Sequence, residues 1–425
     1  MTFERVRLGS LAEVAVSNVD KHSVDGQPIV RLCNYTDVYY QHALDQSREY
    51  MVATASPDQI QKFRLQVDDV VITKDSETAD DIGIPALITE TADDFVCGYH
   101  LAILRPSPQK TDGRYLNWVL QSDDLKAQFE NIAFGVTRVG LKTGRIKTLE
   151  IPVPGGQSAQ ARVADYLDRE TAPIDALIDK QRAMRDLLAA RRIRVMHALV
   201  TGQERERRAS SEHWFGSLPL DWNSARLSHL SQIALGKMIN ARTVSPDQTT
   251  LPYLAAGSIQ PDRLILDECK VMNVNEDEIE KYSLKSGDVV VVEGGAGYGR
   301  SHVLRASLRG WVFQNHVARV RVDRGRLEPR YLRGALEVCR GSGFFEANNR
   351  TATLPSLSRE VLGALVIPLP PLVEQREIAD HLDRETAKID ALIAKAERFI
   401  ELAQERRAAL ITAAVTGQIE IPTED

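Results

Sequence analysis

"LDRETAPIDALI", residues 167–178, and "LDRETAKIDALI", residues 382–393, are nearly the same stretch written twice in a chain of 425 residues. Eleven of the twelve positions are identical, at a separation of 215 residues. The similarity extends without a gap over 163–203 and 378–418, where 22 of 41 positions agree and both copies end in "VTGQ". Self-similarity of this kind indicates a structural unit that is present twice.

Each copy is predicted to form a long helix behind a linker. "IPVPGG" from Ile151 and "IPLPPL" from Ile367 predict the linkers, because proline interrupts regular structure. A short amphipathic helix then leads to Thr171 or Thr386, whose hydroxyl is expected to cap a second helix. That second helix covers about 28 residues, or about 42 Å. Gly202 and Gly417 suit the left-handed residue that ends a helix.

The two long helices share a narrow apolar stripe, which one helix cannot bury alone. We therefore predict that the copies pack on each other as an antiparallel intramolecular coiled coil. The alternative, two unrelated core helices, does not explain why the copies are nearly identical. Eight residues of the stripe are expected to hold the repeat together or to contact partners. They are Leu167, Ile174, Ile178 and Leu188 in the first copy and Leu382, Ile389, Ile393 and Ile400 in the second.

Between the helical copies lie two blocks that resemble each other faintly. "GRYLNWVLQS" from Gly113 parallels "EPRYLRGALE" from Glu328, and "GYHLAILR" parallels "QNHVARVR", which aligns His100 with His316. Runs such as "DDVVIT" and "DVVVVE" indicate strands, and a helix is expected near 115–130 and again near 331–346. The landmarks follow the same order in both blocks.

These patterns predict an α+β chain with an internal pseudo-two-fold repeat, in which each block contains a mixed, twisted sheet. The expected divisions are a first block at residues 1–150, a central repeat with linker and helix at 151–209, a second block at 210–366 and a distal repeat with linker and helix at 367–425.

Composition is that of an ordinary globular protein, 43% hydrophobic and 26% charged. No apolar run approaches the roughly 20 residues of a membrane span, and "MTFERVRLGS" has no apolar signal core. Four widely spaced cysteines without a CxxC pair predict reduced thiols rather than a metal site or disulfides. A cytoplasmic location is expected.

Charge is unevenly distributed along the chain. The net charge of −6 argues mildly against nucleic acid, because duplex binding requires Lys and Arg against phosphate. Local segments differ, however: 296–350 contains eleven Arg and four acidic residues, whereas 36–94 carries about −9. The Arg-rich segment from Arg319 to Arg333 is interpreted either as a solvated surface or as a contact surface for phosphate.

No catalytic pattern stands out. The sequence lacks GxxxxGK[ST], HExxH and GxSxG, and it lacks the Asn-Pro-Pro-aromatic or Asp-Pro-Pro-Tyr stretch of amino-methyltransferases. "VVVVEGGAGYGR", residues 289–300, is typical of a dinucleotide-binding loop only if a helix follows. Here "SHVL" continues as a strand, which favours a glycine-rich hairpin that allows close approach of a ligand to the backbone.

Polar and basic residues near these features are candidate contacts to nucleic acid. Asn pairs with adenine and Arg with guanine through two hydrogen bonds, so the segment from Glu346 onward could read base edges or could be a simple polar turn. His100 and His316 could be functional or hydrogen-bonded structural residues. The predicted DNA contacts are Lys74, Arg138, Lys142 and Arg145 in the first block and Tyr298, Arg300, His302, Asn348, Asn349, Arg350 and Thr351 in the second.

Two divergent blocks alternating with two near-identical helices resemble the specificity (S) subunit of a Type I restriction–modification system over essentially the whole chain. The resemblance is carried by "IPLPPLVEQREIADHLDRETAKIDALI" from Ile367 and by the "VTGQ" endings. The first copy departs from the family pattern, with "GGQSAQARVADYL" in place of "PPLVEQREIADHL".

The resemblance implies that each block is a target-recognition domain for one half of an asymmetric, split site in double-stranded DNA. The helices would set the spacing and bind two modification (methyltransferase) subunits, and restriction (endonuclease/translocase) subunits would join the complex. S-adenosylmethionine, ATP and Mg would belong to those partners, and this chain would carry no cofactor, metal or catalytic residue. A coiled-coil scaffold that bridges two proteins without DNA is the main alternative, and a stand-alone methyltransferase is a weaker one.

Overall fold

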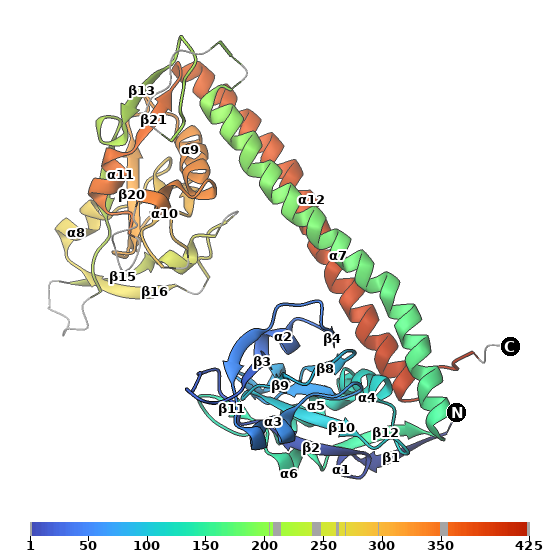
Figure 1. Cartoon of the computed structure of the whole chain (residues 1–425). Helices are drawn as coiled ribbons and strands as arrows, with labels where there is room; N and C mark the ends of the chain where they lie inside the picture. The colour runs from blue at the N-terminus through green and yellow to red at the C-terminus, as the bar shows by residue number, and fades with distance from the viewer. Residues whose placement is uncertain are drawn as a thin grey trace. The chain divides into compact units, whose positions relative to one another are not determined.

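The computed structural model describes residues 2–203, 205–206, 214–239, 248–260, 263–267, 269–295, 297–348 and 356–422. They form two compact units, Met1–Arg182 with Glu397–Asp425, and Ala183–Ala396. Each unit contains one block and part of both long helices (Figure 1).

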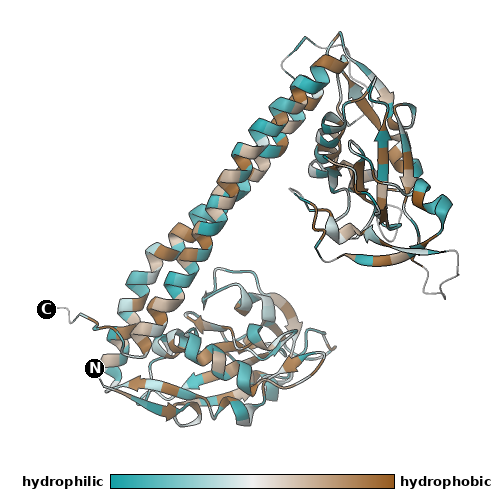
Figure 2. Ribbon diagram, turned by 180° about the vertical axis from the view of Figure 1, so that it is seen from behind, coloured by the Kyte–Doolittle hydropathy of each residue, from teal (hydrophilic) through white to brown (hydrophobic). Residues whose placement is uncertain are grey.

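The long helices are α7, Gln157–Thr201, and α12, Leu372–Val415. In the first unit the start of α7 packs on the end of α12, where Ile178 meets Ile400. In the second unit the end of α7 packs on the start of α12, where Arg192 and Asp390 form an ion pair of 2.8 Å. Both units thus contain an antiparallel helix pair, as predicted (Figure 1). Hydrophobic and hydrophilic residues alternate along both helices (Figure 2).

The prediction of a short helix followed by a capped second helix is wrong. Each copy is one continuous helix, of 45 residues in α7 and 44 in α12, or about 67 Å rather than 42 Å. The Thr171 hydroxyl donates to the carbonyl of Leu167 at 2.7 Å, and Thr386 donates to Leu382 at 2.8 Å. These threonines therefore bond back within the helix instead of capping it.

Pro173 lies inside α7, where it has no amide to donate to the preceding turn. The helix continues because its apolar stripe is buried on both sides of the proline: Leu167 is fully buried against the first block, and Ile178 is buried against α12. Gly202 and Gly417 end the two helices with φ of 61° and 74°, as predicted. Gln203 and Gln418 then donate backbone hydrogen bonds to carbonyls five residues earlier.

The first block is built on a five-stranded sheet in the order β2-β10-β6-β8-β4, in which only β4 and β8 are parallel. A three-stranded sheet β5-β3-β9 and the pairs β1-β12 and β7-β11 complete it. The strands are β1 Phe3–Arg7, β2 Ala12–Val16, β3 Ile29–Cys33, β4 Ala43–Leu44, β5 Met51–Thr54, β6 Val70–Thr73, β7 Asp75–Ser76, β8 Pro85–Ile88, β9 Phe95–Cys97, β10 Leu101–Pro106, β11 Val139–Gly140 and β12 Glu150–Pro154. The helices are α1 Leu8–Leu11, α2 Tyr35–Tyr39, α3 Pro57–Phe63, η1 Ala79–Asp81, α4 Gly113–Leu120, α5 Asp123–Ile132 and α6 Thr143–Ile146.

The second block repeats this plan, with a four-stranded sheet β14-β20-β17-β18, a three-stranded sheet β16-β15-β19 and the pair β13-β21. The strands are β13 Asn223–Arg226, β14 Ser231–Leu235, β15 Thr249–Leu254, β16 Lys270–Val274, β17 Val289–Val292, β18 Ser301–Val303, β19 Val312–Phe313, β20 Val317–Val322 and β21 Val366–Leu369. The helices are η2 Leu227–His229, η3 Ala256–Ser258, α8 Glu276–Lys281, α9 Pro329–Gly341, α10 Phe344–Asn348 and α11 Arg359–Ala364. The α+β fold and the internal repeat are therefore as predicted.

Two local predictions need correction. The proline-rich stretches are strands rather than linkers: β12 pairs with β1, and β21 pairs with β13. Each is the last strand of a two-stranded sheet, a position where proline's missing amide is tolerated. The single helix expected near 115–130 is divided into α4 and α5 at Ser122, whose hydroxyl accepts from the Leu125 amide. In the second block α9 and α10 are likewise separate helices.

Each central sheet lies between two hydrophobic cores. In the first block one core contains residues of α4, α5 and both long helices, and the other contains the three-stranded sheet. The second block has the same pair of cores. Leu382, Met196 and Val200 belong to the core that the second block shares with the long helices. The blocks and helices are therefore not separate folding units.

A buried glutamine in each copy fastens the long helix to its block. Gln375 is fully buried; its amide donates to the carbonyls of Arg326 and Pro370, and its oxygen accepts from the Glu328 amide at 2.9 Å. Gln160 does the same in the first unit, accepting from the Asp112 amide at 3.0 Å. Each glutamine thus satisfies backbone groups at the start of α4 or α9.

Gln375→Leu is expected to lower the free energy of unfolding by about 2–3 kcal/mol, because three backbone groups lose their partner, among them the buried Pro370 carbonyl. Denaturant titration measures the loss. Gln404→Leu is the matched control, because Gln404 is exposed on the same helix and its replacement should change stability by about 0.5 kcal/mol or less. Equal losses in the two variants would show that these hydrogen bonds contribute nothing.

Candidate nucleic-acid interface

A histidine and an aspartate are paired where the central strands of the first sheet end. His100 precedes β10, and its Nδ1 lies 2.8 Å from Oδ2 of Asp75 in β7. The same oxygen accepts from Nζ of Lys74 at 2.6 Å. Lys74 also lies over the ring of Tyr99, 4.7 Å from its centroid, and Tyr99 is 49% exposed. An exposed aromatic ring beside a cation is a suitable surface for a nucleobase.

His100 and Asp75 border an open cleft of about 450 Å³. Strand β11 pairs with β7 and thereby carries the preceding loop, with Arg138, to the cleft. Tyr35 forms another wall, and burial raises the pKa of its hydroxyl. Tyr39 stacks on Tyr35 and donates to Asp81, which raises the pKa of Tyr39 to about 12. The cleft therefore combines aromatic, acidic and basic groups.

The other predicted basic residues of this block are exposed. Lys142 lies over the Phe134 ring at 4.3 Å, and Arg145 lies on the short helix α6. The side chain of Val136, in the same loop, is fully exposed. Of the four predicted contacts in this block, only Arg138 thus lines the cleft, whereas Lys74 is buried and paired with Asp75. Lys142 flanks the Phe134–Arg138 loop, and Arg145 lies further along the chain.

In the second block the glycine-rich stretch is a hairpin between β17 and β18, as expected, and no helix follows it. Gly295 and Gly299 have φ of 80° and 74°, and the Gly299 amide donates to Val292 at 3.0 Å. Tyr298 donates to the carbonyl of Phe345 at 3.4 Å, and Arg300 donates to Gln260 at 3.3 Å. His302 lies in β18 itself. Tyr298 and Arg300 are thus anchored by contacts within the block.

His316 and Glu293 form the corresponding pair in this block, with Nδ1 and Oε2 3.4 Å apart. The Ser356 hydroxyl donates to the other oxygen of Glu293. Of the predicted contacts near this point, Asn349, Arg350 and Thr351 lie outside the described residues, and Asn348 is described only as the last residue of α10.

The Arg-rich segment is not a uniform basic surface: Arg324 and Arg326 are exposed, whereas Arg319 and Arg321 are held within the block. Arg319 is buried and donates to the carbonyls of Lys281 and Ser283. Arg321 forms an ion pair of 2.7 Å with the buried Asp288. Several arginines that produce the positive count of this segment are therefore structural, which sequence counting does not reveal.

Arg330 and its counterpart Arg114 bind pairs of acids on the long helices. Arg330 lies 2.7 Å from Asp380 and 3.0 Å from Asp383. Arg114 lies 2.8 Å from Asp165 and 3.1 Å from Asp168. Burial lowers the pKa of both guanidinium groups, but the bonds to the acids outweigh it and leave the pKa raised. These contacts were not predicted from the sequence, although "RYL" is common to both blocks and the acid pairs are common to both helices.

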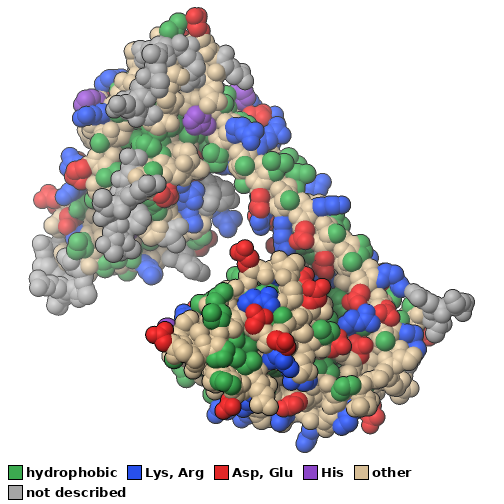
Figure 3. Space-filling model, viewed as in Figure 1, with side chains coloured by type: hydrophobic (Ala, Val, Ile, Leu, Met, Phe, Trp, Pro, Cys, Tyr) green, Lys and Arg blue, Asp and Glu red, His purple; other side chains and the backbone are tan. Residues whose placement is uncertain are grey.

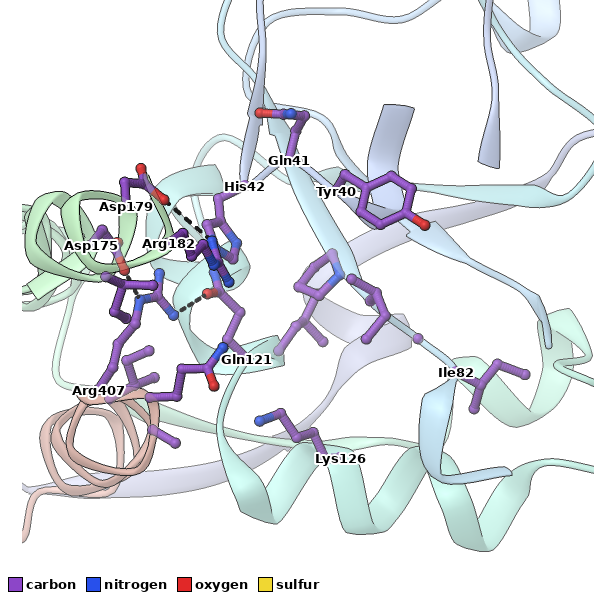
Figure 4. Close-up of a pocket in the computed structure, with 18 residues that line it drawn as sticks. Tyr40, Gln41, His42, Ile82, Gln121, Lys126, Asp175, Asp179, Arg182 and Arg407 are labelled. Carbon is purple, nitrogen blue, oxygen red and sulfur yellow. Dashed lines mark hydrogen bonds and ion pairs between the residues drawn. The ribbon is translucent and has the colours of Figure 1, made fainter. Parts of the chain in front are cut away.

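A cavity of about 590 Å³ lies where the first block meets both long helices (Figure 4). Arg407 donates to Gln121 at 3.1 Å, lies over the Trp118 ring at 5.3 Å and forms an ion pair of 2.7 Å with Asp175. His42 faces the same cavity, and burial together with Arg407 lowers its pKa. Arg192 and Asp390 repeat this ion pair in the second unit. Arg407 thus fixes both helices to the block.

Within the described ranges, no group of three or more His, Cys, Asp or Glu side chains is placed to hold a metal ion. Among the same residues, no helix combines the length and apolar character that crossing a membrane requires.

The family model described as "Type I restriction modification DNA specificity domain" matches twice, at residues 2–183 and 219–401. A putative type I restriction enzyme specificity subunit, MjaX of Methanocaldococcus jannaschii, is 23% identical over 414 residues, covering 94% of this chain and 88% of the relative. The StySPI specificity subunit of Salmonella potsdam is 23% identical over 340 residues, covering 77% and 70%. A solved structure concerned with assembly and conformational transition of a type I system has the same fold, with a TM-score of 0.64, 17% identity and 98% coverage of both chains.

Proposed function

The chain belongs to the Type I restriction–modification DNA specificity family, and from this we propose that it is the subunit that selects the DNA sequence for such a complex. Each block would read one half of a split target, with an unread spacer between the halves. The observation that carries the proposal is the internal duplication: two blocks share one strand plan but present unlike surfaces at equivalent positions.

Pseudo-two-fold repetition suits DNA, because the two strands of a duplex present half-sites in inverted orientation. The reading surfaces differ, with the Tyr35 cleft in the first block and the glycine hairpin in the second. Unlike surfaces predict unlike half-sites, and therefore an asymmetric target. The long helices would set the spacing between the halves.

Two modification (methyltransferase) subunits are proposed to bind along the long helices. Several large apolar side chains of these helices are exposed, as a docking surface requires: Leu177, Met184, Leu187, Leu392, Phe399 and Leu402. S-adenosylmethionine and the adenine methylation chemistry would belong to these partners, and ATP and Mg to restriction subunits that join them. This chain would carry no catalytic step.

The isolated chain is expected to bind its DNA weakly, and the modification subunit should raise affinity at least about tenfold. The reason is charge: the chain carries −6 overall, and acidic and basic side chains are interspersed on the first block in the view of Figure 3. The partners would then supply phosphate contacts, and binding by the complex should weaken steeply with salt. Fluorescence anisotropy with target and scrambled duplexes measures both effects. Equal affinity with and without partners, or no salt dependence, would contradict the proposal.

A further inference from the structure

The histidines of the two histidine–carboxylate pairs occupy the same position in the repeated fold, and their carboxylates come from neighbouring positions of it. The Lys74 amide donates to the His100 carbonyl at 3.0 Å, and the Glu293 amide donates to the His316 carbonyl at 2.9 Å. The next contact repeats as well: Leu141 donates to the Lys74 carbonyl and Leu357 to the Glu293 carbonyl, both at 2.8 Å. The backbone around the two pairs is therefore equivalent, although the sequences of the blocks have diverged.

Both imidazoles are held at one edge and open at the other. In each pair Nδ1 faces the carboxylate, and the His side chains remain 39% and 55% exposed, whereas the carboxylates are only 22% and 17% exposed. A carboxylate at Nδ1 keeps the proton on that nitrogen. In the neutral ring Nε2 is then a hydrogen-bond acceptor of fixed orientation. An acceptor of this kind matches the exocyclic amino groups of adenine and cytosine in the major groove.

The immediate surroundings of the two pairs differ. In the first block Asp75 also binds Lys74, and the cleft beside His100 contains Arg138 and Tyr35. In the second block Glu293 instead accepts from Ser356, and its neighbour Gly294 opens the glycine hairpin. Two domains that share a fold but recognise different DNA sequences are expected to keep a common histidine–carboxylate pair and to differ in the residues around it.

The candidate DNA contacts that were chosen from the sequence lie near the histidine–carboxylate pair in each block. In the first block Arg138 lines the cleft of His100, and Lys74 binds Asp75, which lines the same cleft. In the second block the glycine hairpin begins directly after Glu293, where Gly294 bridges to Ser356. The contacts predicted from the sequence and the histidine–carboxylate pairs therefore lie at equivalent places in the two blocks.

We propose that His100, oriented by Asp75, and His316, oriented by Glu293, are the base-reading side chains of the two blocks, each accepting a hydrogen bond from the amino group of an adenine or cytosine. Asp75 and Glu293 are positioning residues. This inference rests on the proposed function and deepens it, because it names the atom that reads a base in each half-site.

The test uses the full chain co-produced with its modification subunits, and maps methylated adenines across a genome. His100→Ala is expected to relax one adenine- or cytosine-containing position of the first half-site, with discrimination there falling roughly 5- to 100-fold, and to leave the second half unchanged. His316→Ala should relax one position of the second half only. His100→Asn, which keeps a partner for Asp75 but lacks an acceptor at Nε2, should act like His100→Ala.

His22→Ala is the matched control, because His22 also pairs with an aspartate, Asp20 at 3.0 Å, on the exposed loop after β2. It should leave both halves unchanged, and unfolding midpoints should show that all variants are folded. If the unaltered complex methylates a split sequence while folded His100→Ala and His100→Asn change neither half, the inference is wrong and the proposed function stands. If the unaltered complex methylates no split sequence, both fail.

Discussion

Leu167→Asp is expected to lower the free energy of unfolding by about 4 kcal/mol. Leu167 is fully buried where α7 meets the first block, so the substitution removes apolar contacts and places an unpaired carboxylate in that core. The core also contains Ile411 and Val415 of α12, so the helix pair should loosen together with the block. Denaturant unfolding followed by circular dichroism measures the loss.

The matched control is Leu187→Asp on the same helix. Leu187 is 61% exposed, and its replacement should change stability by about 0.5 kcal/mol or less in the isolated chain. If both substitutions destabilise the chain equally, the junction between α7 and the first block does not stabilise the unit as described. The comparison tests position rather than chemistry, because the substitution is the same in both variants.

Exchange of the first block for that of another family member is expected to change one half of the methylated sequence and to leave the other half intact. Discrimination between the old and new first halves should be at least about 10³-fold, the lower range for specific over non-specific binding. Methylated-adenine mapping in a host that carries the partner subunits measures it. The reciprocal exchange of the second block should change only the other half.

The fold shows where the exchange must be cut. A cut after residue 150 would separate β12 from its partner β1, whereas a cut at Gly156, which has a φ of 83° and open space around it, keeps the pair together. The incoming block must retain equivalents of Arg114 and Tyr115, which bind Asp165 and the carbonyl of Pro152. A chimera that folds but changes both halves, or neither, would contradict independent reading by the blocks.

The pairing of the long helices could be predicted from the sequence, because each helix has an apolar stripe that must be buried and the second copy of the repeat supplies a matching stripe. The interruption expected at Thr171 could not, because a threonine hydroxyl can cap a helix or bond back to Leu167, and only burial of the flanking residues decides between them. Likewise, "IPVP" is a strand because β1 lies beside it, from nearly 150 positions away. Local patterns carry no information about such distant partners.

Contacts between residues that are distant in sequence also explain why the candidate site could be predicted only in part. The alignment of His100 with His316 indicated a matched pair, but their carboxylates differ in sequence position, since Asp75 and Glu293 are not aligned with each other. The Arg-rich segment failed as a guide, because Arg319 and Arg321 bind carbonyls and a carboxylate within their own block. A count of charged residues predicts the local electrostatic field only where those charges are not paired within the protein.

Because the first unit includes Glu397–Asp425, its core is completed by a segment that leaves the ribosome long after the first block. Some 214 residues, Ala183–Ala396, are synthesised in between, which takes roughly 10–40 s at typical translation rates. During that interval the surface of the first block that later receives Ile411, Ala414 and Val415 stays uncovered. A nascent chain that stops early therefore exposes an apolar face at its beginning, and chaperones or proteases can remove it before it competes for partner subunits.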